Sequence, residues 1–275
     1  MPLPNLIIIG AMKCGTTSLH FQLRRHPQIA MSRSKELNFL VEERNWKRGV
    51  EWYAARFPDG TPIRGESSPS YSWAARFPGV PVRMHAVVPD ARLVYMVRDP
   101  VERLISHWVH TVEDGTERRP IAEVSGDELY IDRSRYWRQI SLYLPHYASS
   151  RILVVAMEDL SRDPASTLRT VLEFLDVDPE VRLPDLRLHR TEDKRLRTRS
   201  GDWLYRSALG RRINALPQWA RWRVMRDLYR FWPLSRPFER PMLSARDRAA
   251  LAERLREDTN RFREFAGRDF TEWSV

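Results

Sequence analysis

A short segment near the N-terminus combines two glycines, a lysine and two threonines in a spacing that suits phosphate binding. Residues 10–17 read Gly-Ala-Met-Lys-Cys-Gly-Thr-Thr and lie between an apolar run and a stretch with helical character. Glycines let the backbone turn tightly, and the first N–H groups of a following helix attract an anion. A Walker P-loop has its lysine after the last glycine, whereas Lys13 precedes Gly15 here. We therefore predict a phosphate loop that is poorly suited to a kinase, the alternative being an ordinary strand–helix turn.

A second segment, 97–107, reads Val-Arg-Asp-Pro-Val-Glu-Arg-Leu-Ile-Ser-His and also follows an apolar run. Pro100 suits the first turn of a helix, which places Ser106 two turns along it. A guanidinium supplies a fork of donors, so Arg98 and Ser106 could hold a second phosphate from two sides. An Arg-Asp-Pro turn can also be purely structural. Combined with the first segment, it indicates a nucleotide that carries phosphates at both ends.

The apolar pattern predicts the scaffold that positions these segments. Short runs that are apolar on both faces are typical of buried parallel strands. Three such runs are expected to be strands, at 6–9, 93–97 and 152–155, and a shorter strand is expected at 63–66. The expected helices are 16–25 and 101–112. This alternation favours an α/β fold, a P-loop-like parallel sheet with helices on both faces. In such sheets ligands bind beyond the carboxyl ends of the strands, which is where both segments lie.

The last part of the chain, about 201–275, changes to a helical pattern rich in Trp and Arg, with no clear strand. Residues 244–247, Ser-Ala-Arg-Asp, form a capping-box pattern that opens a long helix. We interpret this part as a structural helical extension. Because no low-complexity linker interrupts the sequence, residues 1–275 are expected to form a single domain.

Composition and charge bound the class of protein. The 275 residues carry a formal net charge of +10, nearly all of it from arginine, which suits an anionic partner but can also reflect genomic base composition. Cys14 is the only cysteine, and no histidine pair has ligand spacing, so we expect no disulfide and no metal. The N-terminal apolar run lacks the features of a signal peptide, and no run reaches the roughly 20 residues of a membrane span. We therefore expect a cytoplasmic protein without stable membrane insertion.

Two further segments could each be plain surface segments when taken alone, but together with the first two they form a four-segment pattern. Residues 35–40 read Lys-Glu-Leu-Asn-Phe-Leu, and residues 65–71 read Gly-Glu-Ser-Ser-Pro-Ser-Tyr. Together the four segments resemble the sulfotransferase family, nearest the branch of heparan sulfate N- and 3-O-sulfotransferases and their bacterial relatives. Lys-x-Gly-Thr-Thr is similar to the family's 5′-phosphosulfate loop, and Arg-Asp-Pro-x-x-Arg-x-x-Ser to its 3′-phosphate motif. Further blocks continue the resemblance in the family's order through most of the chain.

The resemblance implies a donor, 3′-phosphoadenosine 5′-phosphosulfate (PAPS), a product, 3′-phosphoadenosine 5′-phosphate (PAP), and no metal. Lys13 would stabilise the departing phosphate oxygen, and Glu36, its proton affinity raised moderately by burial, would deprotonate the acceptor. The implied cofactor-binding residues are Lys13, Cys14, Gly15, Thr16, Thr17, Ser18, Arg98, Ser106, Arg199 and Gly201. Sulfuryl transfer needs an in-line arrangement and stabilised charge, which a lysine and helix N–H groups can supply to a phosphate leaving group.

Two departures from the glycosaminoglycan enzymes bear on the acceptor. Those enzymes often carry His two places after the catalytic Glu and Lys after the Glu of the fourth segment, where this chain has Asn38 and Ser67. We therefore expect a small acceptor, such as a glycoside, glycolipid or secondary metabolite, sulfated on a hydroxyl rather than an amine. Residues 113–130 are the candidate acceptor-side loop. The oligomeric state stays open.

Two other classes of protein remain as alternatives. A P-loop nucleotide kinase would require magnesium, but the lysine is misplaced and no convincing magnesium-binding Asp follows a second strand. A basic nucleic-acid-binding protein would fit the net charge, but the sequence shows no helix-turn-helix, zinc finger or stacking-aromatic signature. We therefore expect a small-molecule partner and no nucleic acid.

Overall fold

The computed structural model describes residues 2–183, 195–216, 224, 228, 234–237 and 241–275. The chain forms two compact units. The first comprises residues 1–107, 122–188 and 243–275, and the second comprises residues 108–121 and 189–242. The expected helical extension is divided between them, and a single domain stays a prediction.

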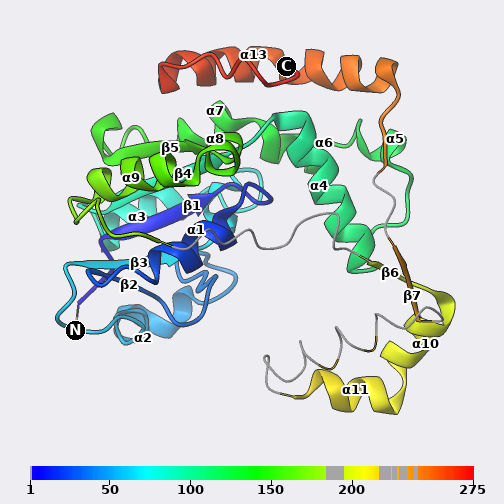
Figure 1. The fold of residues 1–275 in the computed structure, drawn as a ribbon, viewed down its shortest axis with the longest axis horizontal. Helices are drawn as coiled ribbons and strands as arrows, with labels where there is room; N and C mark the ends of the chain where they lie inside the picture. The colour runs from blue at the N-terminus through cyan, green and yellow to red at the C-terminus, as the bar shows by residue number, and fades with distance from the viewer. Residues whose placement is uncertain (1, 184–194, 217–223, 225–227, 229–233, 238–240) are drawn as a thin grey trace. The chain divides into compact units, whose positions relative to one another are not determined.

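A five-stranded sheet lies at the centre of the first unit (Figure 1), with the strand order β2-β3-β1-β4-β5. All four strand pairs are parallel. The strands are β1 (Leu6–Gly10), β2 (Ile29–Met31), β3 (Ile63–Ser67), β4 (Arg92–Val97) and β5 (Ile152–Ala156). From β1 the chain leads to β2 and β3 on one side, and then crosses to β4 and β5 on the other. Ligands of parallel sheets bind at such a reversal, here the carboxyl ends of β1 and β4.

The four strands expected from the sequence are confirmed, and β2 is an additional one. Its three residues are too few to show a periodic pattern, and it pairs only with β3, at Ile29↔Ile63 through Met31↔Gly65. An edge strand of this length is recognised by its partner rather than by its own sequence.

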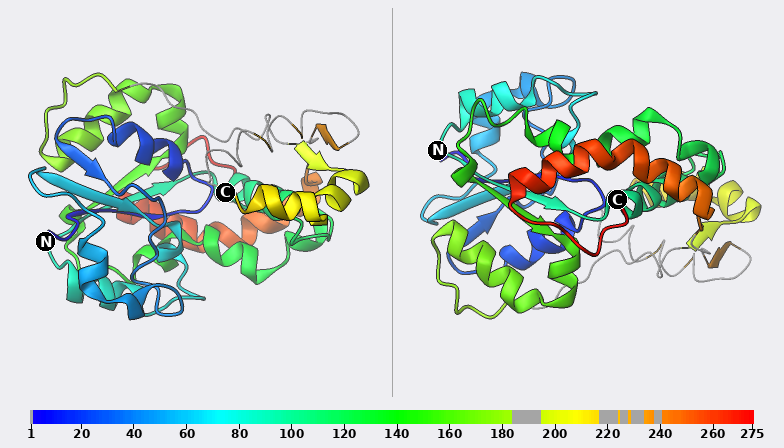
Figure 2. Two further views of the ribbon diagram at one scale, coloured as in Figure 1. Left: turned by 90° about the horizontal axis from the view of Figure 1, so that it is seen from below. Right: turned by 90° about the horizontal axis from the view of Figure 1, so that it is seen from above.

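Helices cover both faces of the sheet, as expected. Figure 2 (left) shows α1 and α9 on one side and α2 and α3 on the other. The helices that lie wholly or partly in the first unit are α1 (Thr16–Leu23), α2 (Gly49–Ala54), α3 (Val80–Val87), α4 (Pro100–Glu113), α5 (Ile121–Val124), α6 (Glu128–Ile131), α7 (Tyr136–Ile140), α8 (Met157–Arg162), α9 (Pro164–Leu175) and α13 (Ala245–Ala266).

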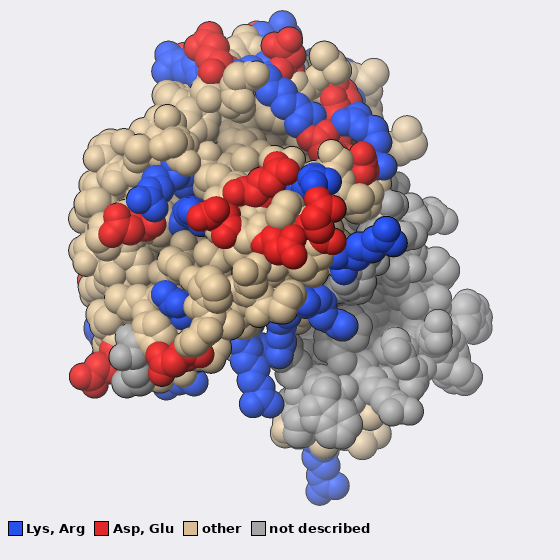
Figure 3. Space-filling model, turned by 60° about the vertical axis from the view of Figure 1, so that its left-hand side comes forward, with Lys and Arg blue, Asp and Glu red and all other residues tan. Residues whose placement is uncertain are grey.

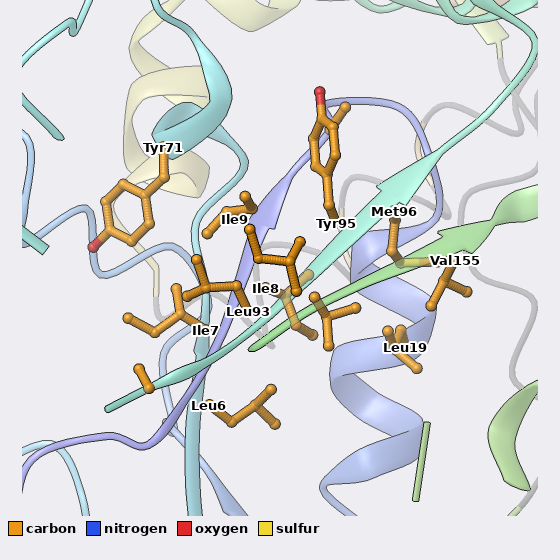
Figure 4. Close-up of a cluster of buried hydrophobic side chains, with 14 of the residues drawn as sticks. Leu6, Ile7, Ile8, Ile9, Leu19, Tyr71, Leu93, Tyr95, Met96 and Val155 are labelled. Carbon is orange, nitrogen blue, oxygen red and sulfur yellow. The ribbon is translucent and has the colours of Figure 1, made fainter. Parts of the chain in front are cut away.

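The core forms around the central strands (Figure 4). All five residues of β1 are buried, and Leu93, Tyr95 and Met96 of β4 are completely so. Leu19 of α1 and Val155 of β5 pack into the same cluster. Each fully buried large apolar side chain contributes roughly 1.5–3 kcal/mol to folding. The strand that leads into the phosphate loop is therefore among the most firmly anchored parts of the molecule.

The long helix expected after residue 244 is α13, and Ser244 is its N-cap. Ser244 Oγ accepts the N–H of Asp247 at 3.1 Å and donates to that carboxylate at 2.7 Å. Phe262 of this helix is completely buried, with its ring centroid 6.2 Å from that of Tyr95 of β4. The carboxylate of Asp258 accepts the backbone N–H of Trp137 at 3.0 Å. The helix is thus packed on the sheet and on α7.

The second unit contains α10 (Arg199–Arg206) and α11 (Ala208–Asn214), with a short antiparallel pair, β6 (Arg195–Arg197) and β7 (Ser235–Pro237). The expectation of no clear strand in the last part of the chain is therefore wrong at β7. Three residues ending in proline carry no strand periodicity, and only the long-range pairing reveals them.

The excess of arginine is interleaved with acidic side chains. Over much of the face in Figure 3, basic and acidic side chains alternate rather than form one continuous basic area. Glu128, for example, pairs with Arg135 at 2.6 Å and with Arg254 at 2.5 Å. Within the described residues, no helix combines the length and apolar character that crossing a bilayer requires.

Candidate active site

The loop between β1 and α1 needs both of its glycines, for different reasons. A Cβ on Gly10 would collide with Ser72 Oγ. Gly15 adopts φ 85°, a left-handed conformation that side chains disfavour, and it is the N-cap of α1. Among the described residues no side chain caps α1 and no acidic residue lies in its first turn. The positive end of this helix is thus arranged for an external anion.

Lys13 and Cys14 lie in the tightest part of this loop. Lys13 is half-buried and adopts φ 72°, an uncommon conformation that is found at functional sites. Cys14 is completely buried, with its Sγ 3.6 Å from Tyr136 Oη, and burial raises the pKa of its thiol to about 11. Its backbone N–H donates to Ala11 O at 3.2 Å. Any contribution of Cys14 to donor binding therefore has to come from the shape of the turn.

The hydroxyl residues assigned to the donor line the first turn of α1. Thr16 and Ser18 are buried, at 4% and 9% exposure, whereas Thr17 is half-buried. Gly15 and these three residues follow one another directly, so their backbone N–H groups form the start of the helix. The structure brings this part of the predicted site together as one continuous loop.

The second segment begins at the end of β4. The backbone of Arg98 is held by Tyr136, whose hydroxyl donates to Arg98 O at 2.8 Å and accepts Arg98 N–H at 3.3 Å. The guanidinium lies 3.6 Å from the carboxylate of Glu102, and its side chain is 18% exposed. Ser106 lies on α4 and is 8% exposed. A fixed backbone and a loosely paired guanidinium suit the binding of an anion.

The neighbours of Arg98 in this segment have structural roles. Asp99 caps α4, because its Oδ1 accepts the N–H groups of Val101 and Glu102 at 2.8 and 2.9 Å. Arg103 is completely buried and donates to Ser134 Oγ and Tyr130 O, both at 2.6 Å. Asp99 in the Arg-Asp-Pro turn and Arg103 on α4 are thus structural, and the assignment of Arg98 and Ser106 to the donor stays a prediction.

The candidate base, Glu36, is more exposed than expected. Its side chain is 51% exposed, and its Oε1 lies 2.8 Å from Lys35 Nζ. The expected burial is therefore wrong, because half of this side chain is open to solvent. Glu36 adopts φ 63°, and its backbone N–H donates to Ser67 O at 3.0 Å.

The third and fourth segments, each of which could have been a plain surface segment, are joined by side chains. Glu66 of β3 is completely buried, and its carboxylate accepts three hydroxyl groups, from Tyr53 at 2.5 Å and from Tyr71 and Ser68 at 2.7 Å each. Ser68 Oγ in turn accepts the N–H of Asn38 at 3.0 Å. The sequence analysis singled out the segment 65–71 but not this network. The motif was the available signal, and the role of the Glu66 carboxylate could not be inferred from it.

Asn38 and Ser67, the two departures from the glycosaminoglycan enzymes, are both turned into the protein. Asn38 is 8% exposed, accepts the hydroxyl of Ser70 and donates to Glu36 O at 2.9 Å. Ser67 is completely buried. At these positions the chain presents no charged side chain to an acceptor.

Arg133 is another residue that the sequence did not single out. Its guanidinium lies 3.3 Å from the centroid of the Trp73 ring and contacts Met12 Sδ in the phosphate loop. Burial, together with the positive charges of Arg103 and Arg44, lowers the pKa of Arg133 to about 9. It therefore contacts the phosphate loop at Met12, and no motif in its own segment could have indicated this contact.

Arg199 and Gly201 lie in the second unit, at the start of α10, where Thr198 Oγ1 accepts the N–H of Gly201 at 3.2 Å. Their assignment to the donor stays a prediction. In the described parts of the chain, no group of three or more His, Cys, Asp or Glu side chains is arranged to hold a metal ion.

A parallel α/β sheet, with a phosphate loop after β1 and an arginine after the neighbouring β4, defines a nucleotide-binding protein of the P-loop-like class. More narrowly, the chain belongs to the sulfotransferase domain family, whose model matches residues 3–199.

Curated relatives agree with this assignment, and a solved structure shares the fold. Mouse heparan sulfate glucosamine 3-O-sulfotransferase 5 is 29% identical over 195 residues, which cover 65% of this chain and 55% of the relative. The bifunctional heparan sulfate N-deacetylase/N-sulfotransferase 1 of Caenorhabditis elegans is 26% identical over 196 residues, covering 64% and 22%. The chain thus spans about half, or less, of these relatives' length. A sulfotransferase from Alicyclobacillus acidocaldarius shares the fold, with a TM-score of 0.71 at 23% identity over 100% of both chains.

Proposed function

We propose that this chain transfers the sulfuryl group of PAPS to a hydroxyl group of a small acceptor. One observation carries the proposal: β1 and β4 are adjacent and parallel, so the phosphate loop and the segment of Arg98 emerge side by side. The backbone N–H of Ala11 also donates to Met96 O at 2.6 Å, which ties the loop to β4. Family membership supports PAPS, with its phosphates at both ends, as the nucleotide.

The proposed roles follow from the chemistry of each residue. Lys13 and the first N–H groups of α1 stabilise the negative charge that develops on the departing phosphate. Arg98 and Ser106 hold the 3′-phosphate. Glu36 accepts the proton of the acceptor hydroxyl, and its 51% exposure leaves the carboxylate accessible to that group. Lys35, 2.8 Å away, orients the carboxylate.

The small acceptor is supported by what Asn38 and Ser67 do. Both side chains are buried, so neither supplies the charged contact that a sulfated polysaccharide would need. A glycoside, glycolipid or secondary metabolite with a free hydroxyl fits this part of the chain better. The cytoplasmic location expected from the sequence also stays a prediction.

Ligand-dependent thermal stability tests the donor. PAP at about 100 times its dissociation constant should stabilise the folded state by roughly 2.7 kcal/mol without added metal. Lys13→Ala should lose most of this stabilisation. Lys47→Ala, the same change at an exposed position, should keep it. Stabilisation by ATP with magnesium but not by PAP would replace the proposal with a nucleotide kinase, and salt-sensitive DNA binding without nucleotide preference would favour a nucleic-acid-binding protein.

A further inference from the structure

The buried carboxylate of Glu66 lies at the centre of a hydrogen-bond network that reaches the segment carrying the candidate base. Glu66 Oε2 accepts the hydroxyl of Ser68 at 2.7 Å, and Ser68 Oγ accepts the backbone N–H of Asn38 at 3.0 Å. Glu66 Oε1 accepts the hydroxyl of Tyr71 at 2.7 Å, and Tyr71 Oη accepts the backbone N–H of Leu40 at 3.3 Å. Two hydroxyl groups therefore connect one carboxylate to the segment 36–40.

Glu66 is the acceptor of the hydroxyl hydrogen bonds in this network. An ionised carboxylate only accepts hydrogen bonds, whereas a hydroxyl has one proton and can also accept. The protons of Ser68 and Tyr71 are therefore directed at Glu66, and their lone pairs stay available to the two backbone N–H groups. Burial raises the pKa of Glu66, and the hydrogen bonds from Tyr53, Tyr71 and Ser68 oppose that rise.

The segment 36–40, whose backbone N–H groups donate to these two hydroxyl groups, contains residues in uncommon backbone conformations. Glu36 adopts φ 63° and Asn38 adopts φ 48°, both in the left-handed region that non-glycine residues rarely occupy. Such conformations persist only where the surroundings over-determine them. The surroundings here include the bond from Glu36 N–H to Ser67 O, the bond from Asn38 N–H to Ser68, and the completely buried side chain of Phe39.

We infer that Glu66 is a positioning residue for sulfuryl transfer: through Ser68 and Tyr71 it fixes the backbone that directs Glu36 towards the acceptor. This inference rests on the proposed function, since it assigns Glu66 a role only through Glu36. Tyr53 is different, because its hydroxyl donates to Glu66 at 2.5 Å but connects the carboxylate to no backbone group of the segment 36–40.

Glu66→Gln is the sharpest substitution, because it keeps the shape but gives the side chain an amide that donates. The amide would donate to the hydroxyl of Ser68 or Tyr71 and turn that hydroxyl's proton towards a backbone N–H. The hydroxyl could then no longer accept that N–H. Single-turnover conversion of PAPS to PAP, with methyl glucoside or water as the acceptor, should slow by about 10- to 100-fold, the cost of a small misplacement. The dissociation constant of PAP should stay within about twofold of the wild type, because a purely positional loss spares binding of the nucleotide.

Further variants separate this role from general destabilisation. Ser68→Ala and Tyr71→Phe should each lower the transfer rate like Glu66→Gln, whereas Tyr53→Phe should lower it much less. Glu66→Gln added to the Ser68→Ala, Tyr71→Phe double variant should have little further effect, since the connections are already gone. Asp258→Asn makes the same carboxylate-to-amide change at a residue that accepts the backbone N–H groups of Trp137 and Arg138, and as the control it should leave the rate unchanged.

A second readout needs no turnover. In Glu66→Gln the backbone amides of Asn38 and Leu40 should exchange hydrogen faster, while those of β1 keep their protection. Unchanged exchange at these amides in Glu66→Gln would overturn the inference. So would an unchanged transfer rate in Glu66→Gln when Glu36→Gln is inactive, and either result would leave the proposed function standing. An active Glu36→Gln enzyme would instead refute the base itself.

Discussion

The backbone N–H of Ala11 donates to the carbonyl oxygen of Met96 at 2.6 Å, which joins the phosphate loop directly to the strand that carries the second anion segment. The register between β1 and β4 shifts at this point, between Ile8 and Gly10. The shift lets the chain leave the ladder and turn into the loop. The two segments that are to hold opposite ends of one nucleotide are therefore fixed on neighbouring strands.

Gly15 should be intolerant of a side chain for a reason that can be separated from stability. Gly15→Ala forces alanine into φ 85° and should cost about 1–2 kcal/mol of unfolding free energy. It should also abolish stabilisation by PAP, because the first turn of α1 would move. Gly60→Ala is the matched control, since Gly60 has φ 86° and open space around it. Urea unfolding with and without PAP measures both effects; equal PAP stabilisation of the two variants would contradict the assigned role of the loop.

Arg98 should recognise the 3′-phosphate specifically. Arg98→Ala should weaken PAP binding by about 1.5–3 kcal/mol, the value of hydrogen bonds to a charged group. Binding of adenosine 5′-monophosphate, which lacks that phosphate, should change little. Isothermal titration calorimetry with both nucleotides measures the difference. Arg151→Ala, at a largely exposed arginine beside Asp90, should change neither affinity. An equal loss for both nucleotides would place Arg98 elsewhere in the site.

Glu36 should matter for transfer and not for donor binding. Glu36→Gln removes the proton acceptor and should slow single-turnover transfer by about 100- to 10,000-fold. PAP affinity should be preserved, since the residue has no assigned contact with the nucleotide. Glu42→Gln, at an exposed carboxylate paired with Arg83, provides the comparison and should be fully active. A parallel loss of PAP binding would instead indicate that the segment around Glu36 had collapsed.

His20 should make stability fall on acidification. It is completely buried on α1, and burial, with Lys35 and Arg24 nearby, lowers its pKa to about 4. The unfolded chain, with a histidine pKa of about 6.5, binds a proton first as pH falls, so folding stability is lost between about pH 6.5 and 4. The contribution is about 1.4 kcal/mol per pH unit within that window. Denaturant unfolding at several pH values should show a shallower slope for His20→Gln, and an unchanged slope for the exposed-site variant His85→Gln.

The sequence was sufficient to predict those elements whose signal lies within one short stretch of neighbouring residues. Buried parallel strands are apolar on both faces, so β1, β4 and β5 could be recognised from their own residues. β3, which reads Ile-Arg-Gly-Glu-Ser, lacks this pattern and was expected only as a shorter strand. The N-cap at Ser244 could also be recognised, since cap and partner lie three residues apart. β2 and β7, with three residues each, could not, because pairing with a distant strand is what makes them strands.

The candidate site divides in the same way. The loop around Lys13 and the segment from Arg98 to Ser106 follow from residue types and spacing, since each is one stretch of chain with its own anion chemistry. The exposure of Glu36 and the network around Glu66 do not. Whether a carboxylate is buried depends on what the fold places over it, and Tyr53, Glu66 and Asn38 meet only in three dimensions.

By itself, then, the sequence determined four of the five strands of the central sheet, the phosphate loop, the second anion segment and the resemblance to the sulfotransferases. The tertiary structure alone decided which strands are neighbours, that Asn38 and Ser67 turn inward, and that one buried carboxylate connects Ser68 and Tyr71 to the segment of Glu36. The physical reason is range. Backbone conformation and helix capping act over a few residues, whereas burial and hydrogen-bond networks depend on groups that the folded chain brings together from far apart.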